Sequence, residues 1–268
     1  SRALEEAFMR YGIPYKLVGG VRFYQRREIK DIIAYLRLIH NPYDNVSLNR
    51  IMNVPPRGIG QRTVGELSAQ AKAQDVPLYA ALQMLKQKEA PTLSKRIEQV
   101  LGNFTALIDE LIAKSQGLNF SGLLDEVLQT TGYKEYISER EDGEERWENI
   151  MELRAAAKEY DELDPQEALT AFLEKVSLVS DIDELDEKAD AVTLITLHQA
   201  KGLEFSVVFI TGMEEGILPH RKSFDKLGEM EEERRLCYVG VTRAQRRVYL
   251  LRAYRRNLFG GSLNPPSR

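Results

Sequence analysis

A polar segment with a glycine follows an apolar run late in the chain, and its side chains could bind a ligand. The run is Val192–Leu197, and the segment is Thr196-Leu197-His198-Gln199-Ala200-Lys201-Gly202-Leu203-Glu204-Phe205. In open α/β sheets, ligands bind at the carboxyl ends of strands. A segment at such an end could present a hydroxyl, an imidazole and a carboxylate together. A capped loop between two strands is the alternative.

A second segment, Glu231–Ala244, predicts a helix that carries an arginine near its end. Leu236, Val239 and Arg243 recur at spacings of three and four, which is typical of one helix face. From charge alone, a solvated arginine near the negative end of the helix dipole is the simpler interpretation.

A third segment, Pro55–Thr63, has two glycines on either side of one apolar residue. Such a turn lets backbone N–H groups point outward before a helix begins, so it could form an anion-binding nest beside its two arginines. It resembles the hairpin of helix-hairpin-helix modules, which bind duplex phosphates, and an ordinary turn is equally compatible with the pattern. The residues concerned are Arg57, Gly58, Ile59, Gly60, Arg62 and Thr63.

A fourth segment, Gly19–Lys30, interleaves basic and aromatic residues after a glycine pair. Aromatic rings can stack on bases while Arg and Lys bind phosphate, which suits single-stranded nucleic acid. Plain packing with a solvated basic edge explains the pattern equally well.

The composition, 43% hydrophobic and 29% charged over 268 residues, is that of one large or two ordinary globular domains. The net charge of −4 conceals a segregation, because residues 135–190 hold 20 acidic and 6 basic side chains while the remainder holds 31 basic and 21 acidic. Arginine and lysine outside the acidic stretch could bind phosphates. The overall charge therefore does not exclude nucleic acid.

Cysteine, histidine and apolar runs set further limits. Cys237 is the single cysteine, so no intrachain disulfide is possible, which favours a reducing compartment. His40, His198 and His220 lie far apart in the sequence, and no metal site is expected. The sequence has no apolar run long enough to span a bilayer and no secretory pattern at its start. We expect a cytoplasmic protein without a membrane partner.

Periodicity predicts the elements that position these segments. A helix is expected over Glu28–Ile39 and another near 230–243, and helical patterns fill most of 43–185. Continuous apolar runs fit strands that are buried on both faces of a parallel sheet. The expected strands are Tyr15–Val18, Val192–Leu197, Val207–Ile210 and Val248–Leu251.

The fold class that these elements predict is α/β, with a parallel-sheet domain interrupted by a mostly α-helical inserted domain. The sheet domain is expected to comprise residues 1–40 and 186–268, and the helical insertion residues 41–185. Because the sequence opens inside a helical pattern at Ser1-Arg2-Ala3-Leu4, we expect the chain to be a piece of a longer protein.

The order and the residues of these segments closely resemble the C-terminal half of the UvrD/PcrA/Rep helicases, which are superfamily-one DNA translocases. The resemblance spans essentially the whole chain. The similar segments are Ser1–Glu6 (motif IV), Gly19–Leu38 (the following motif), Arg57–Gly60 (the duplex-binding element of the inserted domain), Thr193–Phe205 (motif V), Gly212–Gly216 (its extension) and Glu231–Ala244 (motif VI).

This resemblance implies a RecA-like sheet of the P-loop NTPase type, the second of two motor domains that enclose ATP. Arg243 matches the arginine that stabilises the γ-phosphate in the transition state. Gly202 and Glu204 match ATP-binding positions, the glutamate accepting a hydrogen bond from the ribose. The implied contacts to single-stranded DNA are Arg2, Thr196 and His198. The implied duplex contacts are Arg57, Gly58, Ile59, Gly60, Arg62 and Thr63.

The sequence also departs from the pattern of a complete motor. It has no Gly-Lys-Ser/Thr phosphate loop and no strand-borne Asp-Glu pair, since pairs such as Asp109-Glu110 lie in helical patterns. We therefore expect ATP and Mg²⁺ to be ligands of the full-length enzyme, held largely by a first motor domain. This chain alone is expected to hold neither and to hydrolyse ATP negligibly.

The activity implied is that of an ATP-dependent 3′-to-5′ DNA helicase that serves repair or replication, in a bacterial cytoplasm and associated with the nucleoid. The expected partners are DNA, as a single strand and as a single-strand/duplex junction, the first motor domain of the same protein, and repair or replication proteins. Two alternatives stay open: a non-hydrolysing DNA-binding or partner-docking module, and part of a RecB-like helicase-nuclease.

Overall fold

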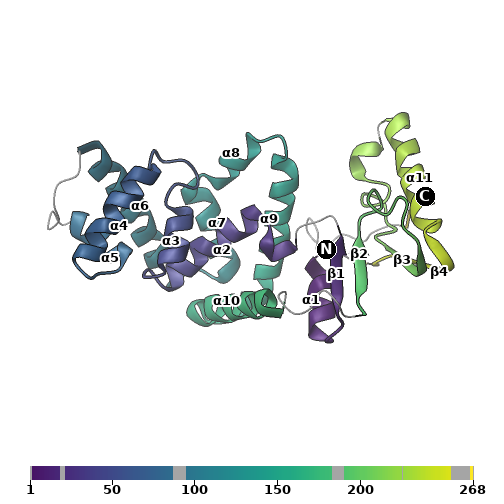
Figure 1. Cartoon of the computed structure of the whole chain (residues 1–268), viewed down its shortest axis with the longest axis horizontal. Coiled ribbons are helices and arrows are strands. Elements are labelled where there is room, and N and C mark those ends of the chain that lie inside the picture. Colours follow the sequence, from purple (N-terminus) through teal and green to yellow (C-terminus); the bar gives the residue numbers. More distant parts are fainter. Residues whose placement is uncertain are drawn as a thin grey trace. The chain divides into compact units, whose positions relative to one another are not determined.

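A computed structural model describes residues 2–18, 22–86, 95–182, 190–224, 226–254 and 266–267. By their contacts the residues form two compact units, one of residues 1–2 and 23–185 and one of residues 3–22 and 186–268. Figure 1 labels the helices and strands of both units. The glycine pair Gly19-Gly20, which opens the fourth segment, lies outside the described residues.

The unit of residues 23–185 is helical. Short 3₁₀ turns, η1 (Phe23–Gln25) and η2 (Lys158–Tyr160), accompany its α-helices. These helices are α2 (Arg27–His40), α3 (Asn45–Ile51), α4 (Gln61–Ala73), α5 (Leu78–Lys86), α6 (Lys95–Lys114), α7 (Phe120–Thr131), α8 (Tyr133–Ser138), α9 (Gly143–Ala157) and α10 (Pro165–Ile182).

Helix α2 lies at the centre of this helical unit, where it contacts α3, α6, α7, α9 and α10. The isoleucine spacing predicts one apolar side, but the structure buries α2 on nearly every side, including Tyr35, Leu38 and Asp31. A helix enclosed by other helices has no solvent face to fill with charge. Helix α2 packs within the helical unit, whose contacts group residues 1–2 with residues 23–185, while the boundary that the sequence places after residue 40 stays a prediction.

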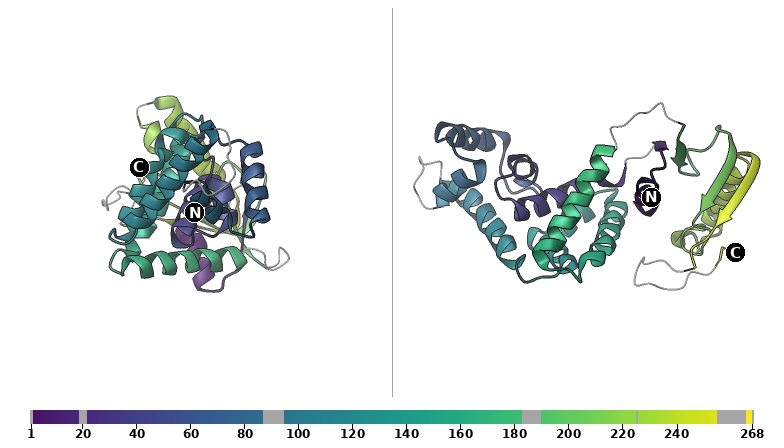
Figure 2. Two further views of the ribbon diagram at one scale, coloured as in Figure 1. Left: turned by 90° about the vertical axis from the view of Figure 1, so that its left-hand side faces the viewer. Right: turned by 90° about the horizontal axis from the view of Figure 1, so that it is seen from below.

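The other unit contains the strands. Among the residues that the structure describes, four strands pair as two parallel two-stranded sheets, β1 with β2 and β3 with β4. The order β3, α11, β4 is a parallel crossover, and Figure 2 shows α11 alongside the two strands, which it contacts. The elements are α1 (Arg2–Arg10), β1 (Tyr15–Val18), β2 (Val192–Ile195), β3 (Phe205–Thr211), η3 (Arg221–Ser223), α11 (Leu227–Val241) and β4 (Ala244–Leu251).

The expectation that the strands are buried on both faces is wrong for β3 and β4. Phe209 is 59% exposed and Leu250 is 54% exposed. Phe209 stacks on Tyr249, its register partner, at 4.8 Å between ring centroids. Successive side chains of a strand point to opposite faces, and α11 packs against the face that carries Ile210, which is 4% exposed. The chain is thus a mixed helix and strand protein with small parallel sheets.

In the part of the chain that the structure describes, no helix combines the length and apolar character needed to cross a membrane.

Candidate functional site

Glu204 and Arg243 are neighbours at the point where β3 and β4 begin. The two strands pair with Phe205 opposite Ala244, and the N–H of Phe205 donates to the carbonyl of Arg243 at 2.9 Å. Each of the two candidate residues immediately precedes its strand, so the strand pairing itself brings them together. Glu204 is exposed and Arg243 is half-buried at the surface.

The guanidinium of Arg243 is held by the end of its own helix and by the segment before β3. Its Nε donates to the carbonyl of Val239 at 3.0 Å, its Nη1 to that of Leu203 at 3.1 Å, and its Nη2 to Oγ1 of Thr242 at 3.1 Å. The carbonyls at a helix end carry partial negative charge, which favours a cation there. A guanidinium has five N–H donors, so these contacts leave donors that a ligand could use.

The segment before β3 bends at Gly202, which has a φ of +85°. A Cβ at this position would meet nothing within 4 Å, so the glycine is required by the backbone conformation and not by a close neighbour. Two residues later, Oε2 of Glu204 accepts a hydrogen bond from Nε2 of Gln245 at 3.0 Å. The carboxylate stays at the surface, where it could accept a further hydrogen bond.

Thr196 and His198 follow the carboxyl end of β2 and are both exposed. The carbonyl of Thr196 accepts from the N–H groups of Gln199 at 3.1 Å and Ala200 at 3.0 Å, which closes a turn. The sequence-based expectation places all polar groups of this segment at a carboxyl strand end. In the structure the hydroxyl and the imidazole lie there, whereas Glu204 lies at the amino end of β3.

Arg2, the remaining candidate contact to a single strand, forms an ion pair with Glu152 of α9, with 3.8 Å between Nε and Oε1. Its side chain is 12% exposed. A phosphate would therefore reach this guanidinium only after local rearrangement.

The turn before α4 has the backbone that the sequence predicts. Gly58 has a φ of +77°, and Gly60, with φ −82° and ψ 168°, is the N-cap of α4. Ile59 is 2% exposed and anchors the turn in the core, as does Thr63, which is 8% exposed. The first N–H groups of a helix have no acceptor within it. In α4 these N–H groups lie in the same first turn as Arg62, whose side chain is 92% exposed.

Arg57 points inward, contrary to the expectation of a guanidinium beside an anion nest. Its Nη1 donates to the carbonyls of Ile51 and Pro55, each at 3.1 Å, and its Nη2 donates to Oη of Tyr35 at 2.6 Å. The guanidinium also lies over the ring of Phe104, 5.4 Å from the centroid. Arg57 satisfies carbonyls that end α3 and shape the turn, so its role in this conformation is structural.

The aromatic residues of the fourth segment belong to the core. Phe23 is fully buried and Tyr24 is 5% exposed, and their rings pack edge to face at 5.1 Å. Neither ring offers a face to a base. The packing alternative is therefore the one that the structure supports for these two residues.

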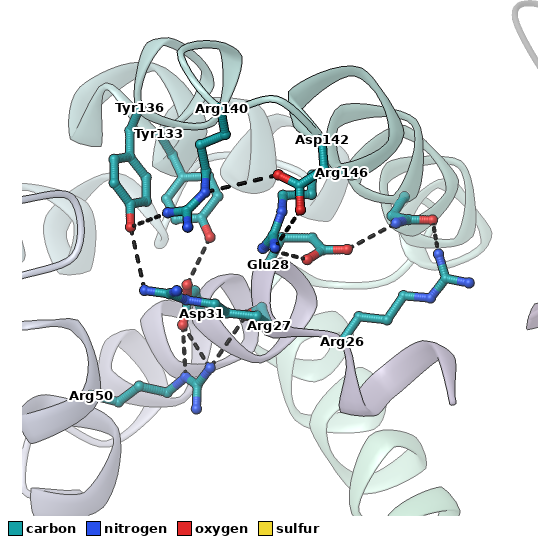
Figure 3. A network of polar contacts seen from close by, with 11 residues as sticks. Arg26, Arg27, Glu28, Asp31, Arg50, Tyr133, Tyr136, Arg140, Asp142 and Arg146 are labelled. Carbon is teal, nitrogen blue, oxygen red and sulfur yellow. Dashed lines mark hydrogen bonds and ion pairs between the residues drawn. The ribbon is translucent and has the colours of Figure 1, made fainter. Parts of the chain in front are cut away.

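The charged residues of the same segment enter a polar network, shown in Figure 3. Glu28, 4% exposed, accepts from Nδ2 of Asn149 at 2.8 Å and from Nη1 of Arg146 at 3.3 Å. Arg26 donates to Oδ1 of Asn149, and Nη2 of Arg27 reaches Oη of Tyr136 at 3.5 Å. These contacts tie the first turns of α2 to α8 and α9.

Asp31, one turn after Glu28, is the second buried carboxylate of the network (Figure 3). Its Oδ1 accepts from Nε of Arg50 at 2.8 Å, and its Oδ2 accepts from Oη of Tyr133 at 2.8 Å. Burial, and then the Asp31 carboxylate, raise the pKa of Tyr133 well above its usual range, so the phenol remains a donor. Asp31 thus joins α2 to α3 and α8.

Sequence reasoning missed three residues that hold the candidate segments in place. Oδ1 of Asn53 accepts from the N–H groups of Arg57 at 2.7 Å and Ile59 at 3.2 Å, which shapes the turn before α4. Glu233 of α11 accepts from the N–H of His220 at 3.0 Å, and Gly240 lets α11 approach β3 closely. The signals available were weak, namely an asparagine four residues before an arginine, an acid in a charged helix and a glycine inside a helix.

The chain belongs to the family of UvrD-like helicase C-terminal domains, which matches residues 1–254. This membership confirms the resemblance that the sequence shows. The matched residues include the helical unit and most of the strand-containing unit, with Glu204 and Arg243.

Several relatives are similar over the whole chain. One is the ATP-dependent DNA helicase PcrA of Bacillus subtilis (strain 168), 42% identical over 277 residues. Another is the ATP-dependent DNA helicase UvrD1 of Mycobacterium tuberculosis (strain ATCC 25618 / H37Rv), 46% identical over 286 residues. A third is PcrA of Staphylococcus aureus (strain MRSA252), 45% identical over 276 residues. The matches cover 100% of this chain and 37% of each relative.

Proposed function

We propose that this chain is the second RecA-like motor domain, with its inserted helical domain, of an ATP-dependent DNA helicase that moves 3′ to 5′. The observation that carries the proposal is the adjacency of Glu204 and Arg243 at the start of the paired strands β3 and β4. The similar proteins are named ATP-dependent DNA helicases, which supports it. The strand-containing unit would be the motor part and the helical unit the insertion, acting on bacterial DNA in repair or replication.

In this proposal Arg243 acts on the phosphates of ATP and Glu204 accepts a hydrogen bond from the ribose. A guanidinium is planar and permanently charged, so it can donate two hydrogen bonds to phosphoryl oxygens as charge develops on them. The contacts to Val239, Leu203 and Thr242 fix the direction of the side chain before ATP arrives. An arginine of this kind typically contributes about 10³–10⁵ in rate.

The metal and most phosphate contacts belong to the first motor domain in this proposal. In the described parts of the chain, no group of three His, Cys, Asp or Glu side chains is arranged to hold a metal ion. We assign no metal step to these residues. We propose that this chain alone hydrolyses ATP negligibly, because its sequence has no Gly-Lys-Ser/Thr phosphate loop, and that the first motor domain would be its principal partner.

DNA would be bound in two places. Thr196 and His198 are exposed after β2 and could contact the backbone of a single strand. The Gly58–Gly60 turn could bind duplex phosphates through the first N–H groups of α4, with Arg62 adding charge. Arg57 is not part of this surface because its guanidinium is engaged inside the unit.

The test is the substitution Arg243→Ala in the full-length protein. We expect kcat for ATP hydrolysis in the presence of single-stranded DNA to fall by about 10³-fold or more, with the ATP KM changed by less than about threefold, because the arginine acts mainly in the transition state. Arg246→Ala is the matched control, since Arg246 is an exposed arginine on β4. It should retain normal turnover.

Three results would contradict the proposal. Equal losses of ATP binding and turnover in Arg243→Ala would remove the transition-state role. A full-length protein that binds junction DNA but shows no ATP hydrolysis would favour the binding-module alternative. Arg243-dependent hydrolysis by this chain alone would show that the first motor domain is not required.

A further inference from the structure

Two arginines from different parts of the helical unit converge on one phenol of its polar network (Figure 3). Nη1 of Arg140, which follows α8, lies 3.3 Å from Oη of Tyr136, and Nη2 of Arg27, at the start of α2, lies 3.5 Å from the same oxygen. Among the residues that the structure describes, Arg27 has no carboxylate partner. Because a phenol is neutral, Tyr136 does not balance the charge of the two guanidiniums.

The polar network holds more cations than anions. Its buried carboxylates, Glu28 and Asp31, each already accept from another arginine. Oδ2 of Asp142 lies 2.7 Å from Nη2 of Arg146, and its Oδ1 lies 3.9 Å from Nε of Arg140, which is longer than a hydrogen bond. The guanidiniums of the network are those of Arg26, Arg27, Arg50, Arg140 and Arg146, and the carboxylates are those of Glu28, Asp31 and Asp142. The network thus has an excess of two positive charges.

The three side chains offer unused hydrogen-bond donors at the surface. Oη of Tyr136 accepts from both arginines, so its O–H remains to donate, and no acceptor for that O–H lies in the described parts of the chain. Arg27 is exposed, the side chain of Arg140 is 36% exposed, and Tyr136 is half-buried. Guanidiniums match the geometry of phosphate oxygens, and tyrosine hydroxyls also donate to the phosphates of DNA. This donor set therefore fits a phosphate.

We propose that Arg27, Tyr136 and Arg140 form a binding site for one backbone phosphate of DNA. The inference rests on the proposed function and adds a contact beside α8, a helix that carries none of the DNA contacts proposed above. Glu139 and Glu141 flank Arg140 and are exposed, so a free phosphate ion would be held weakly. A DNA molecule bound elsewhere on the protein presents its phosphates at a high effective concentration. The site therefore favours a phosphate that belongs to the polymer.

The experiment measures the Kd of the full-length protein, without nucleotide, for a fluorescent single-strand/duplex junction at several salt concentrations. One phosphate contact contributes about 0.7–0.9 to the salt slope, which corresponds to about 5- to 8-fold in Kd at about 0.1 M salt. We expect this loss in the double variant of Arg27→Ala and Arg140→Ala. Each single variant should lose less, because both arginines contact the same phosphate. Tyr136→Phe removes the O–H and no charge, so it should raise Kd by about 2- to 10-fold with an unchanged salt slope.

Lys158→Ala is the control, because Lys158 is an exposed cation of the same unit and is followed by Glu159, Asp161 and Glu162. Its Kd should stay within about twofold of the wild type, since exposed charges that do not contact DNA are screened by salt. Thermal melting of every variant identifies any that fail to fold.

An unchanged Kd and salt slope in the double variant would overturn the inference. A loss of about two in the slope would do the same, because it would mean two separate phosphates. Inorganic phosphate at constant ionic strength tests for a free ion. If it raises the Tm of the wild type alone, while the double variant binds the junction normally, the site holds a free ion and not DNA. A wild type that does not bind the junction would contradict the proposed function, whereas equal binding by wild type and double variant contradicts this inference alone.

Discussion

Removal of Asp31 provides the most direct test of how the helical unit is held together. Asp31 is 2% exposed, and its carboxylate accepts from Nε and Nη2 of Arg50 at 2.8 and 2.7 Å and from Oη of Tyr133 at 2.8 Å. Asp31→Ala leaves the phenol of Tyr133, itself 1% exposed, without its acceptor and Arg50 without its carboxylate. Breaking a buried ion pair costs about 3–5 kcal/mol, and because the side chain of Arg50 is 36% exposed the loss here should lie at the lower end of that range.

Asp31→Asn should cost less, because the amide keeps the shape and can still accept from Arg50 while its NH₂ donates to Tyr133. We expect a loss of about 1.5–3 kcal/mol, the usual value of hydrogen bonds to a charged group. Since 1 kcal/mol shifts Tm by about 2–4 °C in a chain of this size, Asp31→Ala should lower Tm by about 6–20 °C.

The assay is urea denaturation of residues 1–268, followed by fluorescence. Trp147 is the single tryptophan and lies on α9 in the same unit, with Nζ of Lys134 5.0 Å from its ring centroid, so it reports unfolding of the helical unit. Glu110→Gln is the control, because Glu110 forms an exposed ion pair with Lys114 that should be worth no more than about 1 kcal/mol. If Asp31→Ala costs no more than Glu110→Gln, the network does not hold the unit and the reasoning is refuted.

Three further predictions concern the turn before α4 and the tyrosine beneath it. Arg62→Ala should weaken binding of the full-length protein to a single-strand/duplex junction and reduce the salt slope of log Kd by about one, without loss of stability. Arg57→Ala should instead lower the unfolding free energy by about 1–3 kcal/mol, since it leaves carbonyls without a donor, and the reverse pattern would restore Arg57 as a DNA contact. Burial raises the pKa of Tyr35 to about 12 against the lowering effect of Arg57. The pKa of Tyr35 in the folded state lies above its unfolded value of about 10. The contribution of the protonated phenol to the unfolding free energy is therefore complete below about pH 10, and it is lost at about 1.4 kcal/mol per pH unit as the pH rises toward 12. Denaturation between pH 9 and pH 12 measures how much the unfolding free energies of wild type and Tyr35→Phe differ. This difference should shrink as the pH rises, and a constant difference would contradict the raised pKa of Tyr35.

The secondary structure near the candidate site follows closely from local sequence patterns. The apolar run Tyr15–Val18 is β1 in full, and Glu28–Ile39 falls within α2. The family was recognisable because its motifs are short, ordered and specific in residue type. The sequence places Glu204 shortly before the apolar run Val207–Ile210. It does not show that Arg243 directly precedes a strand, because polar residues 245–247 separate Arg243 from the apolar run Val248–Leu251, whereas β4 begins at Ala244.

Tertiary contacts explain what the sequence could not predict. Arg57 points inward because its acceptors, which include the carbonyl of Ile51 and the phenol of Tyr35, converge only after α2 and α3 pack. Likewise, the pattern of Phe23 and Tyr24 among basic residues is the same whether the rings meet bases or a core. The spacing of residues in the sequence predicts on which face of its own helix a side chain lies, but it does not predict which residues of other elements that side chain contacts.

Helix α11 connects segments at both ends of β3, which gives it a particular place in the proposed motor. Near its middle, Glu233 holds the N–H of His220 in the loop that follows the carboxyl end of β3. Its last turn contacts Leu197 through Gly240 and leads to Arg243, which lies beside the amino end of β3. A rigid helix cannot move at one of these contacts and remain still at the other. A shift of α11 as a rigid body would therefore displace both the loop after β3 and the segment of Thr196 and His198.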